Sequence, residues 1–190
     1  ATAGEPLAVW DLDEGVVRAR WRAHTGQTVT VAAAADLVAS GGTDHRVRLW
    51  DPTSGTCVAE MAGHRAWVTS VAIDGAGGRV VSASADGTLR VWSRDGGCER
   101  VLSGHTGPVH AVVVDRLGER AVSGGADGTV RVWDLASGEA VRTFGGHSGP
   151  VEDVELVDAG LGAVSVGPHT VRVWDLERMT SSRQLRPKVR

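Results

Sequence analysis

The chain has 190 residues, of which 42% are hydrophobic, and its formal net charge is −3. This composition is typical of a globular domain with a sizeable core. The mildly acidic balance argues against nucleic acid as a partner, because nucleic-acid binding needs a basic surface. The sequence has no run of about 18 apolar residues, so we expect no membrane association through a spanning helix.

The two cysteines, Cys57 and Cys98, lack the C-x-x-C or Cys/His spacing that a zinc site needs. We therefore expect no metal, and no motif in the sequence calls for a cofactor. No signal peptide is visible, and the low cysteine content predicts a reducing, cytoplasmic environment. Arginine far outnumbers lysine, with Lys188 the single lysine, which indicates GC-rich coding and favours a bacterial source.

In chain order, the first predicted elements are two short strands, LAVWD at residues 7–11 and VVRARWRAH at residues 16–24. In the second strand, arginines alternate with Val17, Ala19 and Trp21, as expected of an edge strand that is protected by charge. We expect Trp21 to pack between the strands of this half-unit.

Beyond this point the chain repeats itself at a period of about 41 residues. A tryptophan and a histidine mark the period, and each histidine follows a Gly or an Ala. The marker residues are Trp10, Trp50, Trp92, Trp133 and Trp174, with His24, His64, His105 and His147.

The third full unit shows the pattern of its strands most clearly. We expect strands at residues 109–115, 120–125, 129–134 and 140–144, separated by turns of which Ala-Asp-Gly is a strong hairpin signal. Such a small sheet cannot bury both faces alone, so neighbouring units must stack and curve into a ring. The predicted fold class is therefore all-β, a β-propeller of four-stranded antiparallel blades.

These units, with the pattern GH…S…D…WD, resemble the WD-repeat β-propeller family over roughly residues 7–180. The resemblance implies one WD-repeat domain over residues 1–190, with about four to five blades. The predicted limits are a partial blade at 7–24 and blades at about 25–62, 63–103, 104–145 and 146–186.

Seven units are the commonest number in the family, and this chain is short for such a ring. Three arrangements stay open: a piece of a longer, seven-bladed propeller, partial rings that self-associate, or a small closed ring of four or five blades. The tail after residue 180 is expected to supply a weak last strand, which Pro187 disturbs.

The resemblance also implies a buried hydrogen-bonded chain in each unit, running from Asp through His and Ser to Trp. We expect the fourth unit to be the loosest, since Pro168 and His169 replace its Asp-Gly. The matching residues are His24, Ser40, Asp44 and Trp50; His64, Ser82, Asp86 and Trp92; His105, Ser123, Asp127 and Trp133; and His147, Ser165 and Trp174.

Ser, His and Asp can also form an acyl-transfer triad. Catalytic groups are rarely copied in consecutive units, however, whereas every unit of a repeat has the same packing problem to solve. We therefore expect these residues to be structural, no catalytic residues, and a protein that is not an enzyme.

In the family, partners often dock on one rim of the ring. The rim positions carried over to this sequence are Gln27, Val29 and Thr43; Trp67, Thr69 and Ala85; Pro108, His110 and Ala126; and Pro150, Glu152 and Gly167. Trp67 lies outside the repeat of marker tryptophans, and it either anchors a partner or covers a neighbouring blade. His110 has no nucleophile near it in the pattern and is not expected to act as a general base.

The leading hypothesis is a non-catalytic protein–protein interaction scaffold, with proteins or peptides as partners. It is expected to form the repeat region of a larger regulatory or signalling protein. Two alternatives are an enzyme or small-ligand-binding propeller, and a structural unit for self-assembly.

Overall fold

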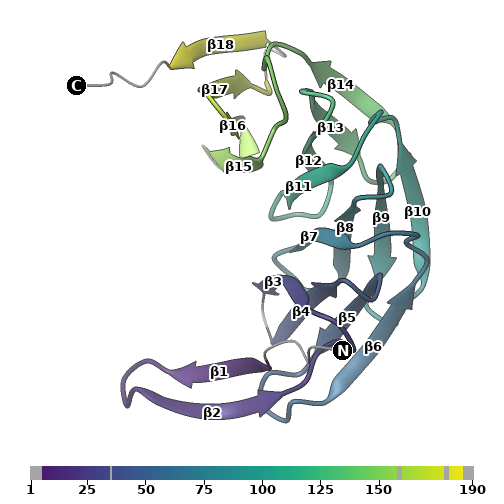
Figure 1. Ribbon diagram of the computed structural model, residues 1–190, viewed down its shortest axis with the longest axis vertical. Helices are drawn as coiled ribbons and strands as arrows, with labels where there is room; N and C mark the ends of the chain where they lie inside the picture. Colours follow the sequence, from purple (N-terminus) through teal and green to yellow (C-terminus); the bar gives the residue numbers. More distant parts are fainter. Residues whose placement is uncertain (1–5, 35, 158–159, 178–179, 186–190) are drawn as a thin grey trace.

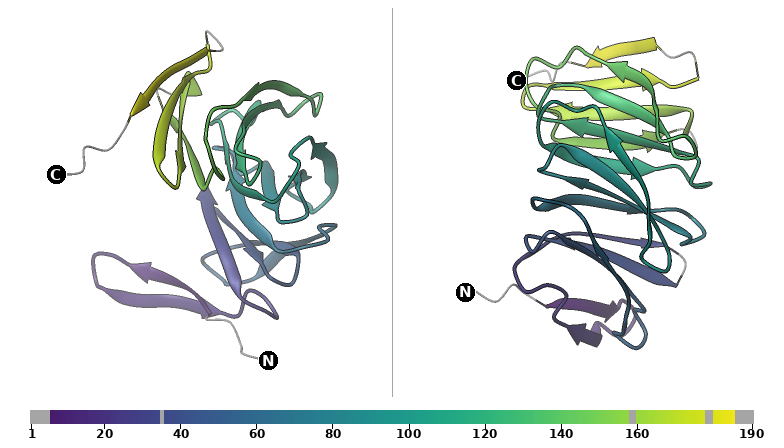
Figure 2. Two further views of the ribbon diagram at one scale, coloured as in Figure 1. Left: turned by 45° about the horizontal axis from the view of Figure 1, so that its top comes forward. Right: turned by 90° about the vertical axis from the view of Figure 1, so that its right-hand side faces the viewer.

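The computed structural model describes residues 6–34, 36–157, 160–177 and 180–185. These residues form one two-stranded and four four-stranded antiparallel sheets, which confirms the predicted all-β fold of four-stranded blades. The sheets follow one another along an open arc (Figure 1), and they stack as successive twisted layers (Figure 2). Within the described ranges, no helix has the length and apolar character needed to cross a membrane.

The two-stranded sheet consists of β1 (Leu7–Asp11) and β2 (Val16–Trp21). The first complete sheet contains β3 (Thr28–Ala34), β4 (Leu37–Gly42), β5 (Arg46–Trp50) and β6 (Cys57–Ala62). The second contains β7 (Val68–Ile73), β8 (Arg79–Ser84), β9 (Thr88–Ser93) and β10 (Cys98–Ser103). The third contains β11 (Val109–Val114), β12 (Arg120–Gly125), β13 (Val130–Asp134) and β14 (Ala140–Phe144). The fourth contains β15 (Asp153–Val157), β16 (Gly162–Gly167), β17 (Thr170–Asp175) and β18 (Thr180–Leu185).

Each complete sheet is a meander in which every strand pairs with the next along the chain. The first strands, β3, β7, β11 and β15, line the concave side of the arc, and the last strands lie on the convex side (Figure 1). Consecutive residues at the end of the third strand are both buried in the first three complete sheets, such as Val132 and Trp133 in β13, because stacked sheets cover both faces. A β-bulge separates Val132 from Trp133 in the pairing with β14.

The hydrophobic core is divided into clusters that lie between neighbouring sheets. In each cluster the marker tryptophan of one sheet packs against the preceding sheet. Trp133, for example, shares a cluster with Leu89, Val91 and Leu102 of the second sheet, and Trp174 stacks on Phe144 of the third at 4.9 Å between ring centroids. Each sheet is therefore stabilised chiefly by its neighbours, as in other stacked-repeat folds.

Trp21 also packs between neighbouring sheets, and the expectation that it packs within its own half-unit is wrong. Its ring lies 5.8 Å from that of Trp50, in the next sheet. Trp21 has the position in β2 that Phe144 has in β14, three residues before the unit's His, so it packs forward onto the next marker tryptophan.

Candidate functional site: the buried network and the rim

The structure brings each predicted Ser, His and Trp together inside one sheet. The four serines have no exposed surface. Their Oγ atoms lie 2.7–2.9 Å from a histidine Nε2 and accept the indole N–H at 2.8–2.9 Å. The four groups of three residues are His24, Ser40 and Trp50; His64, Ser82 and Trp92; His105, Ser123 and Trp133; and His147, Ser165 and Trp174.

The aspartates complete this chain in the first three units. The Nδ1 atoms of His24, His64 and His105 lie 2.8, 2.9 and 3.0 Å from a carboxylate oxygen of Asp44, Asp86 and Asp127. A carboxylate can only accept, so Nδ1 donates and Nε2 is left as an acceptor for the serine hydroxyl. The serine then accepts the indole N–H, so that every member has a partner.

The protonation states of the histidines and aspartates in this network depend on two opposing effects, burial and hydrogen bonding. Burial lowers the pKa of His105 despite the opposing effect of Asp127, so the imidazole is neutral at pH 7. Burial alone would raise the pKa of Asp127. Hydrogen bonds from Thr129, the Thr106 amide and His105 outweigh it and lower the pKa from 3.8 to about 2.

In the fourth unit, a threonine stands in for the missing aspartate, which was not expected from the sequence. His147 Nδ1 lies 2.7 Å from Thr170 Oγ1. In the third unit the corresponding Thr129 already stands beside the network, with its Oγ1 2.7 Å from Asp127 and 3.4 Å from His105 Nδ1. A threonine two positions after the place of the turn aspartate was the signal that could have identified this substitute.

The burial of the serines bears on the question of catalysis. A nucleophile must reach its substrate, and a hydroxyl without exposed surface, already bonded to an indole and an imidazole, cannot do so. This favours the structural interpretation. Among the described residues, no group of three or more His, Cys, Asp or Glu side chains could hold a metal ion.

The Gly before each His faces an arginine two residues before the marker tryptophan. A Cβ at Gly104 would come within 2.7 Å of an Arg131 nitrogen. Where Ala23 replaces this Gly, Arg48 is bound differently, with nitrogens 2.8 Å from Asp44 and 2.7 Å from Glu60. The departure from Gly in the first unit is thus accompanied by an ion-pair network.

The rim positions lie at one edge of the sheets, where odd-numbered strands begin and even-numbered strands end. Backbone bonds hold the two loops of each unit together in the first three units: Thr43 N donates to Gln27 O, Ala85 N to Trp67 O and Ala126 N to Pro108 O, at 2.8–3.0 Å. In the fourth unit, a Cβ on Gly167 would lie 2.9 Å from Pro150 O, so these two residues are also neighbours.

Two of the predicted rim side chains are used within the fold. Thr69 Oγ1 donates to Val109 O at 2.6 Å, and His110 Nδ1 lies 3.1 Å from Val151 O. Both bonds join one sheet to the first strand region of the next. The equivalent residues at the ends, Val29 and Glu152, are exposed.

Trp67 has the most prominent side chain of the rim set. It is 58% exposed, which favours its interpretation as a partner anchor over that as a cover for a neighbouring blade. A hollow of about 270 Å³ lies between the Ala85–Asp86–Gly87 turn, whose Ala85 N–H donates to Trp67 O, and the His105–Pro108 loop of the next unit. Gln27, Pro108 and Pro150 are also exposed, so the rim presents apolar and polar groups on fixed loops.

The repeats match a known family. The WD domain, G-beta repeat family (WD40) matches residues 15–51, 55–93, 96–134 and 138–175. Each matched stretch contains the outermost strand of one sheet and the three inner strands of the next, so consecutive repeats interlock.

Among curated proteins, the chain is similar to the ribosome biogenesis protein YTM1 of Podospora anserina, with 36% identity over 100 residues, 46% of this chain and 20% of the relative. It is 34% identical to the nuclear distribution protein nudF of Aspergillus flavus over 70 residues, 37% of this chain and 15% of the relative. It is 30% identical to the DENN domain and WD repeat-containing protein SCD1 of Arabidopsis thaliana over 89 residues, 47% of this chain and 8% of the relative. The chain therefore spans at most a fifth of the length of these three relatives.

Family domains of this kind typically serve as protein-interaction scaffolds and are generally non-catalytic. Four consecutive matched repeats cover most of the residues, and each has its place in the sheets described above. This chain belongs to the WD40 family of G-beta repeat proteins.

Proposed function

We propose that this domain binds a partner protein or peptide at its rim, with Trp67 as the anchor. The observation that carries the proposal is the 58% exposure of this indole on loops that backbone hydrogen bonds hold in place. Tryptophan is enriched at the centres of interfaces, since it buries a large apolar area and still offers a hydrogen-bond donor.

The hollow lined by Ala85, Asp86 and Pro108 indicates the chemistry of the partner. Ala85 and Pro108 contribute apolar surface, and Asp86 is at its edge. A peptide loop that presents one apolar side chain next to a backbone or side-chain donor would fit this combination. Thr69 and His110 contribute less to binding in this proposal, because their side chains are bonded to the next sheet.

The proposal extends to a wider setting, a larger regulatory protein of the bacterial cytoplasm. The similar protein SCD1 is named for a DENN domain as well as WD repeats, which supports a multidomain context. Cys57 and Cys98 are free and exposed, which supports a reducing compartment. Within that protein, the role that the family resemblance implies is regulation or signalling.

The test is a comparative pull-down with immobilised wild-type protein, Trp67→Ala and Leu117→Ala, each checked for an unchanged melting temperature. Leu117 is 76% exposed in the turn between β11 and β12, at the opposite edge from the rim, and serves as the matched control. We expect partners of the wild type to be lost with Trp67→Ala and retained with Leu117→Ala. Retention of all partners by Trp67→Ala would place the interface elsewhere.

A further inference from the structure

The arginine two residues before the marker tryptophan differs in its partners from sheet to sheet. In the first complete sheet, Glu60 of β6 is the register partner of Arg48, and its Oε2 atom lies 2.9 Å from Arg48 Nε and 2.7 Å from Arg48 Nη2. Asp44 supplies a second carboxylate, 2.8 Å from Arg48 Nη1. Arg48 therefore shows how this fold binds the guanidinium when acidic side chains are within reach.

Arg131, the equivalent residue of the third complete sheet, lacks both of these carboxylates. Its register partner in β14 is Thr143, which is exposed. Asp127 already accepts hydrogen bonds from His105 and from the amide and hydroxyl of Thr129. Among the described residues, Arg131 forms no hydrogen bond or ion pair, and its Nε atom is buried. Arg131 is thus a half-buried cation whose two expected acidic partners are replaced or otherwise bonded.

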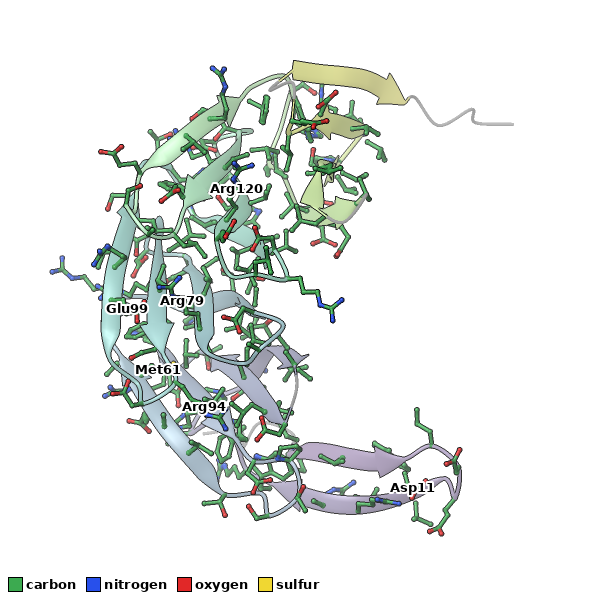
Figure 3. All side chains as sticks on the ribbon, turned by 180° about the vertical axis from the view of Figure 1, so that it is seen from behind. Asp11, Met61, Arg79, Arg94, Glu99 and Arg120 are labelled. Atoms are coloured by element: carbon green, nitrogen blue, oxygen red, sulfur yellow. The ribbon has the colours of Figure 1, made fainter. Side chains whose placement is uncertain are left out.

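The surroundings of Arg131 leave it open to a ligand. Side chains of the outermost strands project from the convex side of the arc, where Glu99 of β10 lies 3.2 Å from Arg79 Nε of β8 (Figure 3). A Cβ at Gly104 would lie 2.7 Å from Arg131 Nη1, so the guanidinium is held beside Gly104, and Ser103 and Gly104 are exposed. Buried polar atoms in folded proteins are nearly always hydrogen-bonded, so the unbonded Nε of Arg131 favours a ligand that brings an acceptor.

We propose that Arg131 and Thr143 form a binding site for an acidic side chain, glutamate or aspartate, of a partner protein. The carboxylate would bind the Arg131 guanidinium as Glu60 binds Arg48, and the Thr143 hydroxyl would donate to its second oxygen. Hydrogen bonds between a guanidinium and a carboxylate are among the strongest in proteins, because both groups are charged and their planar shapes match.

Arg90 and Arg172 of the second and fourth sheets also have a buried, unbonded Nε, but each has other contacts. They lie over the rings of their marker tryptophans, 5.8 and 5.9 Å from the ring centroids. One Nη atom of Arg90 donates to the Cys98 sulfur, and one of Arg172 donates to Gly146 O. The register partner of Arg90 is the apolar Val101, which offers no donor for a carboxylate. Arg131 is therefore the strongest candidate of the three.

The acidic-side-chain site is independent of the proposed function of the rim. Neither Arg131 nor Thr143 is among the rim positions, and the site does not use Trp67. Four-stranded sheets stand on both sides of the third sheet, so the surroundings of Arg131 are complete. Loss of rim binding would leave this site unaffected.

The probe is the peptide acetyl-Gly-Glu-Glu-Gly-amide, with acetyl-Gly-Gln-Gln-Gly-amide as its neutral control. In isotope-labelled protein, the NMR signal of the Arg131 Nε–H group, assigned by its loss in Arg131→Lys, reports the proposed bond directly. We expect a saturable shift of this signal with the glutamate peptide and none with the glutamine peptide. In Arg131→Lys, binding followed by the backbone amides of Gly104 and Thr143 should be at least about tenfold weaker, because the planar fork is lost.

Thr143→Glu fills the site from within the chain. It places a carboxylate where Glu60 stands in the first sheet, so it should shift the Arg131 signal without peptide and weaken peptide binding at least about tenfold. An unchanged or raised melting temperature checks that the variant folds. The matched control is Val58→Glu, which adds the same charge at an exposed position of another outermost strand, β6, and should bind the peptide as the wild type does.

Several outcomes would overturn the proposal. One is an Arg131 signal that does not respond to the glutamate peptide or responds equally to the glutamine peptide. Another is unchanged peptide affinity in Arg131→Lys or in Thr143→Glu. Inorganic phosphate is the last probe: binding as tight as that of the glutamate peptide would assign the site to phosphate groups and would also overturn the proposal.

Discussion

Thr170 stands beside His147 in the position where an aspartate stands beside the histidine of the other three units. Its Oγ1 lies 2.7 Å from His147 Nδ1, about as close as the carboxylate oxygens lie to His24, His64 and His105. A neutral hydroxyl thus replaces a charged acceptor, and the His147–Ser165–Trp174 chain is retained.

Thr170→Val should destabilise the protein by about 1 kcal/mol, because it keeps the shape of the side chain and removes one neutral hydrogen bond. Thermal unfolding of the variant and the wild type gives the difference. The control is Thr28→Val, another half-buried strand threonine, for which no network bond is lost. An unchanged midpoint for Thr170→Val would show that the hydroxyl does not support His147.

Asp127→Ala should cost more, about 1–3 kcal/mol, since it removes a charged acceptor and leaves His105 buried without its partner. Asp127 also accepts hydrogen bonds from the amides of Thr106 and Thr129. Denaturant unfolding measures the loss. The matched substitution Asp13→Ala, in an exposed turn, should change stability by less than about 0.5 kcal/mol.

His45→Gly should be neutral or should stabilise the protein by up to about 1 kcal/mol. His45 has a φ of 65°, a left-handed conformation that disfavours a side chain, and Gly87 and Gly128 occupy the same turn position at 83° and 72°. The reciprocal change, Gly128→Ala, should destabilise, because the new Cβ would lie 3.0 Å from Gly149 O. Opposite shifts in melting temperature for the two variants are the expected result.

Stability should fall as the pH is lowered from 7 towards 4. Burial lowers the folded-state pKa of His24, His64 and His105, so their neutral forms contribute stability above about 6.5 that is lost as protons bind the unfolded chain. The pKa of Asp127, lowered to about 2, adds a second loss below its ordinary 3.8. Melting temperatures from pH 8 to 3 test this, and a midpoint that rises on acidification would contradict it.

The same series in Asp127→Asn separates the two groups. The asparagine side chain cannot gain a proton in the acid range, so the decline in stability below about pH 4 should be shallower than in the wild type. The decline between about pH 6.5 and 5 should remain, because the buried histidines of the first two units are unchanged. If the melting temperatures of the variant and the wild type fall equally below about pH 4, Asp127 is not the group that titrates.

The repeat period, the strand pattern and the turn signals could be predicted from the sequence, since they depend on local alternation and on turn residues such as Asp-Gly. The strands of the third unit illustrate this: residues 109–115 were expected and Val109–Val114 is observed, while 120–125 coincides with Arg120–Gly125. The resemblance to the WD-repeat family, carried over to the matching positions of each unit, also implied which Ser, His and Trp would come together.

Other features depend on contacts between units, which no single period contains. Trp21 packs on Trp50 of the next sheet, and Thr69 and His110 bond to carbonyls in or just before the first strand of the next sheet. Local sequence thus determined each sheet and its internal hydrogen bonds, apart from the bond between Thr170 and His147 that replaces the missing aspartate. Only the stacking of the sheets decided which side chains form bonds between neighbouring sheets. It also decided which side chains, such as Trp67, Trp10 and Val31, are left uncovered.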